Sequence, residues 1–354
     1  MKERNHAFDF LCGICILRMI TLHVGGMCGY RSDLWCSKMM AWTFFFMSFF
    51  FFKAGYFNKT VAGNTWEYCK DRTKRLLVPY LTWGVIGNIV FFGTMMLNVE
   101  AFRPFLENKV HLEHLWRTSR FWGNAPLWFL FSFYISYMFM HVITRLSSSG
   151  YRLGGINIRV KGLRWIILTF PFISYWLYKE GNPLWLSLNN VFLGISFFFL
   201  GRLWHWVMKN VDRRVVAVAC CLMLAGFYYV NKYHHGEYDM SVNVYAHHAY
   251  GAIISTVLAL CGFSGLLLML PQKRIPFVNF IGEHSMVFFV VHYPILHFYR
   301  LIHRVFRHDI VHHWEDFILM MLVVLVVCCW LVPYVEKVPW LSGRYGKGKL
   351  KVKS

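Results

Sequence analysis

The sequence predicts an all-α, polytopic integral membrane protein, and three observations carry that prediction. Of 354 residues, 57% are hydrophobic and 19% aromatic, while only 15% are charged, well below the roughly 25% typical of soluble domains. The apolar residues gather in runs long enough to cross a hydrocarbon core about 30 Å thick. No loop the size of a soluble domain interrupts these runs, so we expect one domain over residues 1–354, with a membrane bundle over about 8–334 and a basic cytoplasmic tail over 335–354.

Ten apolar segments are expected to span the membrane as helices, because lipid offers the backbone no hydrogen-bond partners. They lie at 8–28, 38–57, 76–97, 126–144, 163–178, 184–207, 215–231, 247–270, 280–299 and 317–334, and the fifth, seventh and tenth are short. The first follows a short basic N-terminus, as a signal peptide would. It has no small-residue cleavage site and carries Arg18 and His23, so we expect it to be retained as a helix.

The charge balance is strongly basic, with 37 Lys and Arg against 17 Asp and Glu and a formal net charge of +20. In a soluble protein this excess would indicate nucleic-acid binding. Here the basic residues mostly lie in short segments between apolar runs, which indicates a cytoplasmic rim facing anionic membrane lipids and no nucleic-acid partner. Placing the N-terminus inside puts most Lys and Arg in cytoplasmic segments. The positive-inside rule therefore predicts that both termini are cytoplasmic.

Most of the ten cysteines lie inside apolar runs, where a thiol behaves as a small hydrophobe. Cys28 and Cys36 flank one short loop and could form a disulfide if that loop faces an oxidising compartment, but free thiols are the expected state. The sequence has no CxxC pair, and no acidic or Cys partner completes a metal site with the histidines. We therefore expect no metal.

The first apolar segment carries three ionisable residues, Asp9, Arg18 and His23. Such groups are costly inside a membrane and are functional candidates by default. On a helix, Asp9 and His23 fall within about 40° of each other and Cys12 shares their face, whereas Arg18 lies about 140° from His23. His23 is about 20 Å above the start of the segment, nearer the outer membrane surface. An interhelical hydrogen bond is the alternative to function for His23.

A basic cluster, Arg72-Thr73-Lys74-Arg75, precedes the third apolar segment. Arg72 and Arg75 are one helical turn apart, so their guanidinium groups can converge on one polyanion. A helix N-terminus at a cytoplasmic mouth also favours phosphate. Lipid anchoring under the positive-inside rule is the alternative, but it does not call for paired arginines.

Six blocks of the sequence resemble the membrane acyltransferase 3 family, in the family's order and over roughly residues 8–334. The first resembles that family's Asp-x-x-(Lys/Arg)-x10-His helix, except that Cys12 stands where the family has Lys or Arg. The second has Ala54 where the family has Ser. The blocks are Phe8–Leu11 through Leu22-His23, Phe44–Phe46 through Ala54–Phe57, Arg72-x-x-Arg75 before Leu76–Tyr80, Leu127–Leu130, Phe197–Gly201, and Gly282–Ser285 through His292–Pro294.

The resemblance implies transfer of an acyl group, usually acetyl, from cytoplasmic acyl-CoA to a hydroxyl or amine of a glycan or other envelope molecule. It implies that His23 is the catalytic histidine and that Arg72 and Arg75, with Lys74 between them, help to hold the donor. CoA is a phosphate-rich anion, which suits a cationic mouth. His23 would act as a general base on the acceptor hydroxyl or as a transient acyl carrier.

The remaining candidates are supporting or channel residues. Asp9 lies too far below His23 to orient it and is assigned to the bundle or the donor channel, and Arg18 must face another neighbour. Trp128 is either a residue of the aromatic belt or part of an acceptor pocket. Glu283 and His292 are expected on opposite faces of one helix, with His292 able to approach His23.

The sequence thus predicts a membrane O-acetyltransferase that modifies polysaccharide in the cell envelope, located in the bacterial inner membrane. Its expected partners are acetyl-CoA or another acyl-CoA, a glycan or lipid-linked sugar as acceptor, and membrane lipids. Two alternatives remain. One is a transporter or flippase of lipid-linked sugars, although the inverted repeats and broken helices common in such proteins are not evident. The other is an inactive family member, given Cys12.

Overall fold

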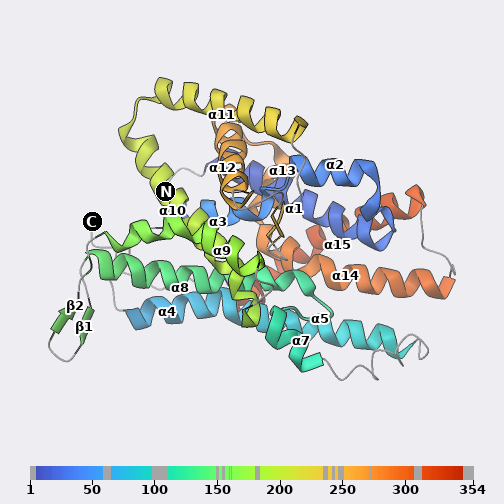
Figure 1. Cartoon of the computed structure of the whole chain (residues 1–354). Helices are drawn as coiled ribbons and strands as arrows, with labels where there is room; N and C mark the ends of the chain where they lie inside the picture. The colour runs from blue at the N-terminus through green and yellow to red at the C-terminus, as the bar shows by residue number, and fades with distance from the viewer. Residues whose placement is uncertain are drawn as a thin grey trace. The chain divides into compact units, whose positions relative to one another are not determined.

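The computed structural model describes residues 5–58, 65–97, 111–148, 151–153, 156–158, 160, 162–179, 184–233, 238–240, 244–245, 251–270, 273–306 and 313–345. Each of the ten predicted segments contains a helix, which confirms the all-α class (Figure 1). Seven helical stretches are long and apolar enough to cross a membrane: 6–27, 34–57, 65–96, 125–148, 185–210, 285–303 and 314–337. Leu163–Leu177 is a shorter apolar helix. The total of ten spans and the cytoplasmic placement of both termini stay predictions.

Among the described residues, the strands form two short antiparallel hairpins. Strand β1 (Tyr151–Leu153) pairs with β2 (Ile156–Ile158), with Arg152 opposite Asn157. Strand β3 (Tyr238–Asp239) pairs with β4 (Val244–Tyr245). Both hairpins lie in segments that connect helices, so they leave the helical class unchanged.

The chain divides into two compact units, which are described separately. Unit 1 comprises residues 1–43, 74–131 and 272–346. Unit 2 comprises residues 44–73, 132–271 and 347–354. In each unit, segments far apart in the sequence pack together.

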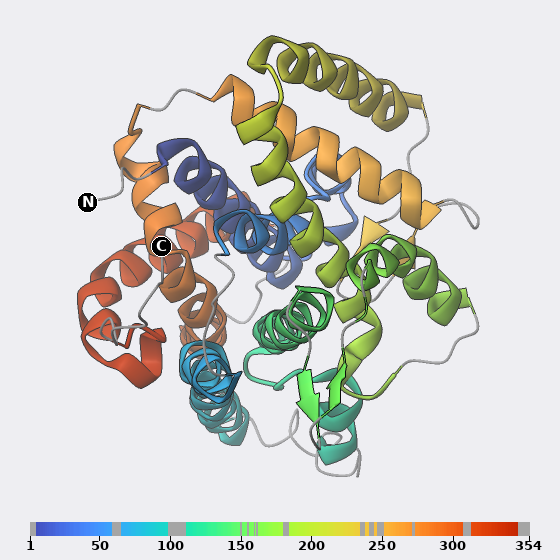
Figure 2. The same ribbon diagram turned by 90° about the vertical axis from the view of Figure 1, so that its left-hand side faces the viewer.

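Unit 1 is built around the first helix, α1 (His6–Met27), which packs against α13 (Pro276–Glu283), α14 (Ser285–Phe306) and α15 (Trp314–Lys337). Helix α14 also runs beside α15 and α5 (Val78–Met96) (Figures 1 and 2). The remaining elements of the unit are η1 (Tyr30–Ser32), α2 (Leu34–Trp42), α7 (His111–Thr118), η3 (Ala125–Leu127) and α16 (Pro339–Ser342).

The contact between α1 and α13 depends on glycines, because the two backbones approach too closely for a side chain. A Cβ atom at Gly282 would overlap the backbone oxygen of Asp9, and one at Gly13 would overlap the backbone oxygen of Val278. Asn5 caps the start of α1, where its Oδ1 accepts a hydrogen bond from the backbone N–H of Phe8 at 3.2 Å.

Unit 2 is organised by the close pairing of α3 (Phe46–Phe57) with α10 (Leu188–Asn210). A Cβ at Gly55 would overlap the backbone oxygen of Phe198, and one at Gly201 would overlap that of Phe52. Phe49, Phe51 and Phe52 are fully buried, so the Phe-rich second segment fills the core of the unit. The other elements are α4 (Thr65–Arg72), the part of α8 (Trp128–Ser148) from Ser132 on, η4 (Leu163–Thr169), α9 (Phe170–Lys179), η5 (Trp185–Ser187), α11 (Arg213–Tyr233) and α12 (Gly251–Met269).

Two predicted helices are interrupted in the structure. The segment predicted over 38–57 is divided into α2 and α3, where Thr43 bonds back through its hydroxyl to the backbone oxygen of Met39. The segment predicted over 280–299 breaks at His284, whose backbone leaves the helical conformation at φ −107° and ψ 21°. Glu283 and His292 were predicted on opposite faces of one helix, and this is wrong because Glu283 ends α13 and His292 belongs to α14.

The third predicted segment begins earlier than expected. Helix α4, the π-helical turn η2 (Thr73–Leu77) and α5 follow one another without a break over residues 65–96. A π turn has a wider repeat than an α-helix. The one-turn spacing expected for Arg72 and Arg75 in an α-helix therefore does not describe this segment.

Candidate active site

His23 of α1 lies beside two residues of α14. The centroids of the His23 and His292 rings are 5.3 Å apart, with an angle of 33° between the ring planes. Tyr293 meets His23 edge-on, also with 5.3 Å between the centroids. The structure thus brings together two histidines that are separated by about three quarters of the sequence. His23 is half-buried and His292 is fully buried.

The hydrogen bonds of His292 fix its tautomer. Its Nδ1 lies 2.8 Å from the backbone oxygen of Phe289 and 3.1 Å from that of Phe288. Backbone oxygens only accept hydrogen bonds, so Nδ1 must carry the hydrogen and donate it. The Nε2 atom is buried and has no hydrogen-bond partner among the described residues.

Aromatic side chains connect this histidine pair to the Leu127–Leu130 block. Phe289 packs on His292 with 6.4 Å between the ring centroids, and Phe129 packs on Phe289 at 5.5 Å. Trp128 meets Phe129 edge-on at 6.2 Å and is only 5% exposed. A residue of the lipid-facing belt would be exposed, so burial argues against that interpretation of Trp128, and its place in an acceptor pocket stays a prediction.

Arg18 and Cys12 are both buried within unit 1. The Nε of Arg18 donates a hydrogen bond to the hydroxyl of Thr43 at 3.0 Å, which gives Arg18 a neighbour outside α1. Arg18, Arg31 and Arg120 are the arginines whose charges act on His23.

Asp9 and Glu283 meet at the other end of α1. Together with His6 they offer one nitrogen and two carboxylate oxygens, which all lie within 4.8 Å of one another. Such a set is able to hold a cation. However, Glu283 already pairs with Arg274, with 3.3 Å between Oε2 and Nη2. The group was not predicted, because helix breakage at His284 was not foreseen.

Arg72 belongs to unit 2 and is held there by aromatic rings. Its guanidinium carbon lies 4.4 Å from the ring centroid of Tyr137 and 5.2 Å from that of Tyr68. Its Nε is 4.0 Å from the carboxylate of Asp71. Cation–π contacts with two rings hold the guanidinium in place, and arginine makes such contacts more often than lysine.

Lys74 and Arg75 belong to unit 1 and lie against the C-terminal segment. The Nζ of Lys74 is 5.6 Å from the ring centroid of Tyr345. The backbone oxygen of Arg75 lies directly against Gly343. The indole N–H of Trp83, two helical turns further on, donates to the backbone oxygen of Leu341 at 2.9 Å. The start of α5 and the segment around α16 are thereby held together.

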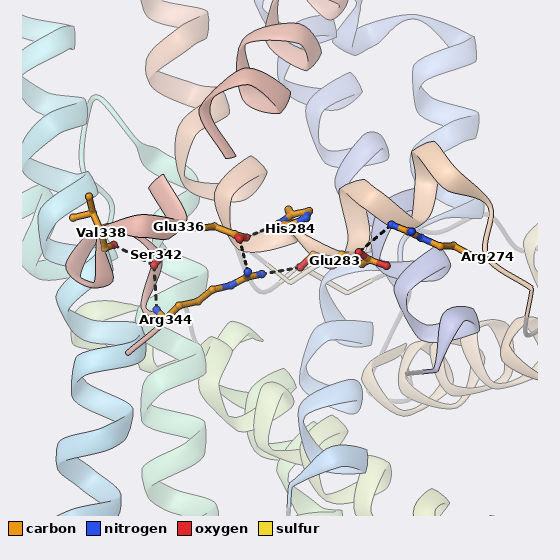
Figure 3. A network of polar contacts seen from close by, with 7 residues as sticks. All are labelled: Arg274, Glu283, His284, Glu336, Val338, Ser342 and Arg344. Atoms are coloured by element: carbon orange, nitrogen blue, oxygen red, sulfur yellow. Dashed lines mark hydrogen bonds and ion pairs between the residues drawn. The ribbon is translucent and has the colours of Figure 1, made fainter. Parts of the chain in front are cut away.

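A polar network fastens this C-terminal segment to the break between α13 and α14 (Figure 3). Glu336 bridges Nδ1 of His284 and Nη1 of Arg344, each at 2.5 Å. Arg344 also donates from Nη2 to the backbone oxygen of Glu283 at 3.1 Å. Glu283 at the end of α13, His284 at the break before α14, Glu336 of α15 and Arg344 after α16 thus form one connected set. Arg274, Glu336 and Arg344 were not predicted as site residues. In the sequence the two arginines resemble ordinary positive-inside charges, and Glu336 is a single acid just after the last apolar segment.

The two loop cysteines are free thiols. Cys28 and Cys36 are both buried and unbonded. Burial, together with the negative charge of Asp316, raises the pKa of the Cys28 thiol to about 11. The neutral thiol is therefore the form present near neutral pH.

Comparison with known proteins gives one match. The model of a family described as an acyltransferase domain matches residues 5–337, nearly the whole chain. Searches of curated proteins and of solved structures found no match. The matched range contains His23, His292 and the basic cluster at 72–75.

Proposed function

Since the chain belongs to the membrane acyltransferase 3 family, we propose that it moves an acetyl group from cytoplasmic acetyl-CoA to a hydroxyl of a cell-envelope glycan, with His23 as the base. Family membership establishes a membrane acyltransferase in general. The donor, the acceptor and the role of His23 are our proposal. The observation that supports this proposal most strongly is the position of His23 beside His292, a second histidine whose tautomer is fixed.

The proposed reaction needs a base because a hydroxyl is a poor nucleophile. A neutral His23 accepts the proton of the acceptor hydroxyl while the oxygen attacks the thioester carbonyl. A C–O bond forms, the C–S bond breaks, and the CoA thiolate leaves and takes up a proton. If His23 carries the acyl group transiently, the same ring attacks first and the hydroxyl attacks second. Both routes require an unprotonated ring nitrogen on His23.

The donor side is proposed at the basic cluster. Arg72, Lys74 and Arg75 bring three cationic side chains within four consecutive residues, and phosphate groups pair strongly with guanidinium. The cation–π contacts of Arg72 with Tyr68 and Tyr137 support this role, because they hold the guanidinium in place. With the N-terminus in the cytoplasm, this cluster faces cytoplasmic acyl-CoA.

The acceptor side is proposed near the C-terminal end of α1, around His23 and Trp128. Phe129 and Phe289 connect Trp128 to His292, and an indole face is suited to stacking against the apolar side of a sugar ring. The proposed acceptor is a glycan or lipid-linked sugar, and the proposed location is the bacterial inner membrane. This arrangement would modify polysaccharide of the envelope by O-acetylation.

Purified protein in detergent or vesicles tests the proposal. Radiolabelled acetyl-CoA should transfer label to a glycan acceptor, and His23→Ala should lower the rate at least about 100-fold, as loss of a general base does. His297→Ala removes another buried histidine of unit 1 and serves as the matched control. Transport of a lipid-linked sugar without acyl-CoA and without label transfer would contradict the proposal and favour a flippase.

A further inference from the structure

We propose that His292 is a positioning residue, which accepts a hydrogen bond from a ring N–H of His23 and so fixes the tautomer and orientation of the base. This inference rests on the proposed function, because it assigns a role within the same site. It follows from the tautomer of His292, the burial of its second nitrogen and the separation of the two rings.

The hydrogen-bond partners of His292 fix its tautomer. Both atoms near Nδ1 of His292 are backbone oxygens, those of Phe288 and Phe289. Neither can donate, so the ring hydrogen of neutral His292 is on Nδ1. Its Nε2 then carries a lone pair and can only accept.

The lone pair on Nε2 of His292 is buried. His292 is 0% exposed, and Nε2 has no hydrogen-bond partner in the described part of the chain. Buried polar atoms in native proteins are almost always hydrogen-bonded, because a buried polar atom without a hydrogen bond costs free energy. The site therefore calls for a donor next to Nε2.

The distance between the His23 and His292 rings suits a hydrogen bond from His23 to this Nε2. An N–H···N hydrogen bond of about 2.9 Å plus two ring radii of about 1.1 Å gives a centroid separation of about 5.1 Å when the nitrogens face each other. The observed separation is 5.3 Å. Rotation of the half-buried His23 ring about its terminal torsion is enough to aim an N–H at His292, since this torsion is soft.

Tyr293 is the competing donor. Its ring centroid is 5.9 Å from that of His292, with an angle of 79° between the planes. Because Tyr293 directly follows His292 on α14, its side chain leaves the helix in a different direction. The ring of His23 is nearer and less tilted, so we assign the hydrogen bond to His23.

The proposed hydrogen bond has a chemical consequence. When one nitrogen of His23 donates to His292, the other nitrogen must hold a lone pair, and that nitrogen takes the proton of the acceptor hydroxyl. After the transfer His23 has an N–H on each nitrogen and a positive charge. The hydrogen bond to Nε2 of His292 is then charge-assisted and stabilises this state.

Two substitutions at position 292 separate this role from mere packing. His292→Asn places an amide N–H near the position of Nδ1, which keeps a donor for the backbone oxygens, but leaves nothing near Nε2. His292→Gln reaches the position of Nε2 and offers a carbonyl oxygen there as acceptor. His297→Asn is the matched control, because His297 is also buried on α14 with an unpartnered Nε2.

The measurement is steady-state transfer of acetyl from acetyl-CoA by the full chain. His292→Asn should lower kcat about 100-fold with little change in the KM for acetyl-CoA. The kcat of His292→Gln should be about tenfold higher than that of His292→Asn. His297→Asn should stay within about twofold of wild type. Full activity of His292→Asn, or an equal loss in His297→Asn, would overturn the inference.

A measurement on the wild-type protein does not depend on whether a variant folds. The ring ¹⁵N shifts of labelled His23 should show one protonated and one unprotonated nitrogen at a pH where the ring is neutral. Equal, averaged shifts for both nitrogens would overturn the inference. If His23→Ala is fully active, the proposed function itself fails. If His23→Ala is inactive while His292→Asn is fully active, only the role of His292 fails.

Discussion

The backbone oxygen of Arg75 lies so close to Gly343 that any side chain at position 343 would overlap it. Gly343 also has a φ of +68°, a conformation that favours glycine. Two separate requirements therefore demand glycine where the C-terminal segment meets the basic cluster.

Gly343→Ala should disturb the donor site through Arg75. Relief of the overlap requires the segment after α16 to move away from the start of α5, which shifts the backbone that carries Lys74 and Arg75. We expect the KM for acetyl-CoA to rise about tenfold, which corresponds to about 1.4 kcal/mol of lost binding. The kcat should change much less. Kinetics at varied acetyl-CoA concentration would measure both.

Gly162→Ala is the control for the backbone strain alone. Gly162 also has a positive φ, +79°, but its nearest neighbour for a Cβ is 3.9 Å away. This variant should lose some stability without a change in KM. An unchanged KM in Gly343→Ala would refute the contact between the C-terminal segment and the donor site.

Gly282→Ala should destabilise unit 1. A Cβ there would overlap the backbone of Asp9, and rigid backbone cannot move aside as a flexible side chain can. Overpacking of this kind costs about 1–3 kcal/mol or more, so the melting temperature in detergent should fall by several degrees. Gly26→Ala on the exposed part of α1 has no atom within 4 Å of its Cβ and should be neutral or slightly stabilising. Equal melting temperatures for both variants would argue against the close packing of α1 on α13.

Cys12→Arg restores the residue type found at this position in the family, yet we expect it to impair this protein. Cys12 is 0% exposed, and a buried arginine in a membrane helix costs several kcal/mol. The charge of Arg18 already acts on His23. The variant should melt earlier than Cys12→Ala and show no gain in kcat. A rise in kcat with unchanged melting would show that the site lacks a cation that the arginine supplies.

Cys28 should react with iodoacetamide only at high pH. Its pKa is raised to about 11 by burial and by Asp316, so the reactive thiolate is scarce at pH 8 and becomes more abundant as the pH rises towards 11. Cys69, a partly exposed free thiol outside the ten predicted spans, is the control. Mass spectrometry of single-cysteine modification rates at pH 8 and pH 10 would test this. Rapid modification of Cys28 at pH 8 would contradict it, and resistance after unfolding without reductant would indicate a disulfide with Cys36.

The helices were predictable because segments that span lipid are recognised in a sequence by their length and apolar composition. The first segment, predicted over 8–28, is observed as α1 over His6–Met27. The breaks were not predictable in the same way. His284 lies inside an apolar run, and its departure from helical geometry accompanies a pairing with Glu336, which is 52 residues further along the chain.

The candidate site was predictable in part. Helical periodicity placed Asp9 and His23 on one face of α1, and the His-x-Pro block drew attention to His292. Periodicity describes the faces of one helix but not which helices meet. The proximity of Asp9 to Glu283 and the contact of Gly343 with Arg75 depend on tertiary packing between distant segments, for which a single sequence holds no signal.

Mass spectrometry of envelope glycans tests the central claim most directly. Cells that lack this protein would be complemented with the wild-type chain, with His23→Ala, or with His297→Ala, at equal levels of folded protein in the membrane. We predict that the wild type and His297→Ala each make one glycan species heavier by a single acetyl unit, whereas His23→Ala does not. Restoration of the heavier glycan by His23→Ala would contradict the role of His23 as the group on which acyl transfer depends.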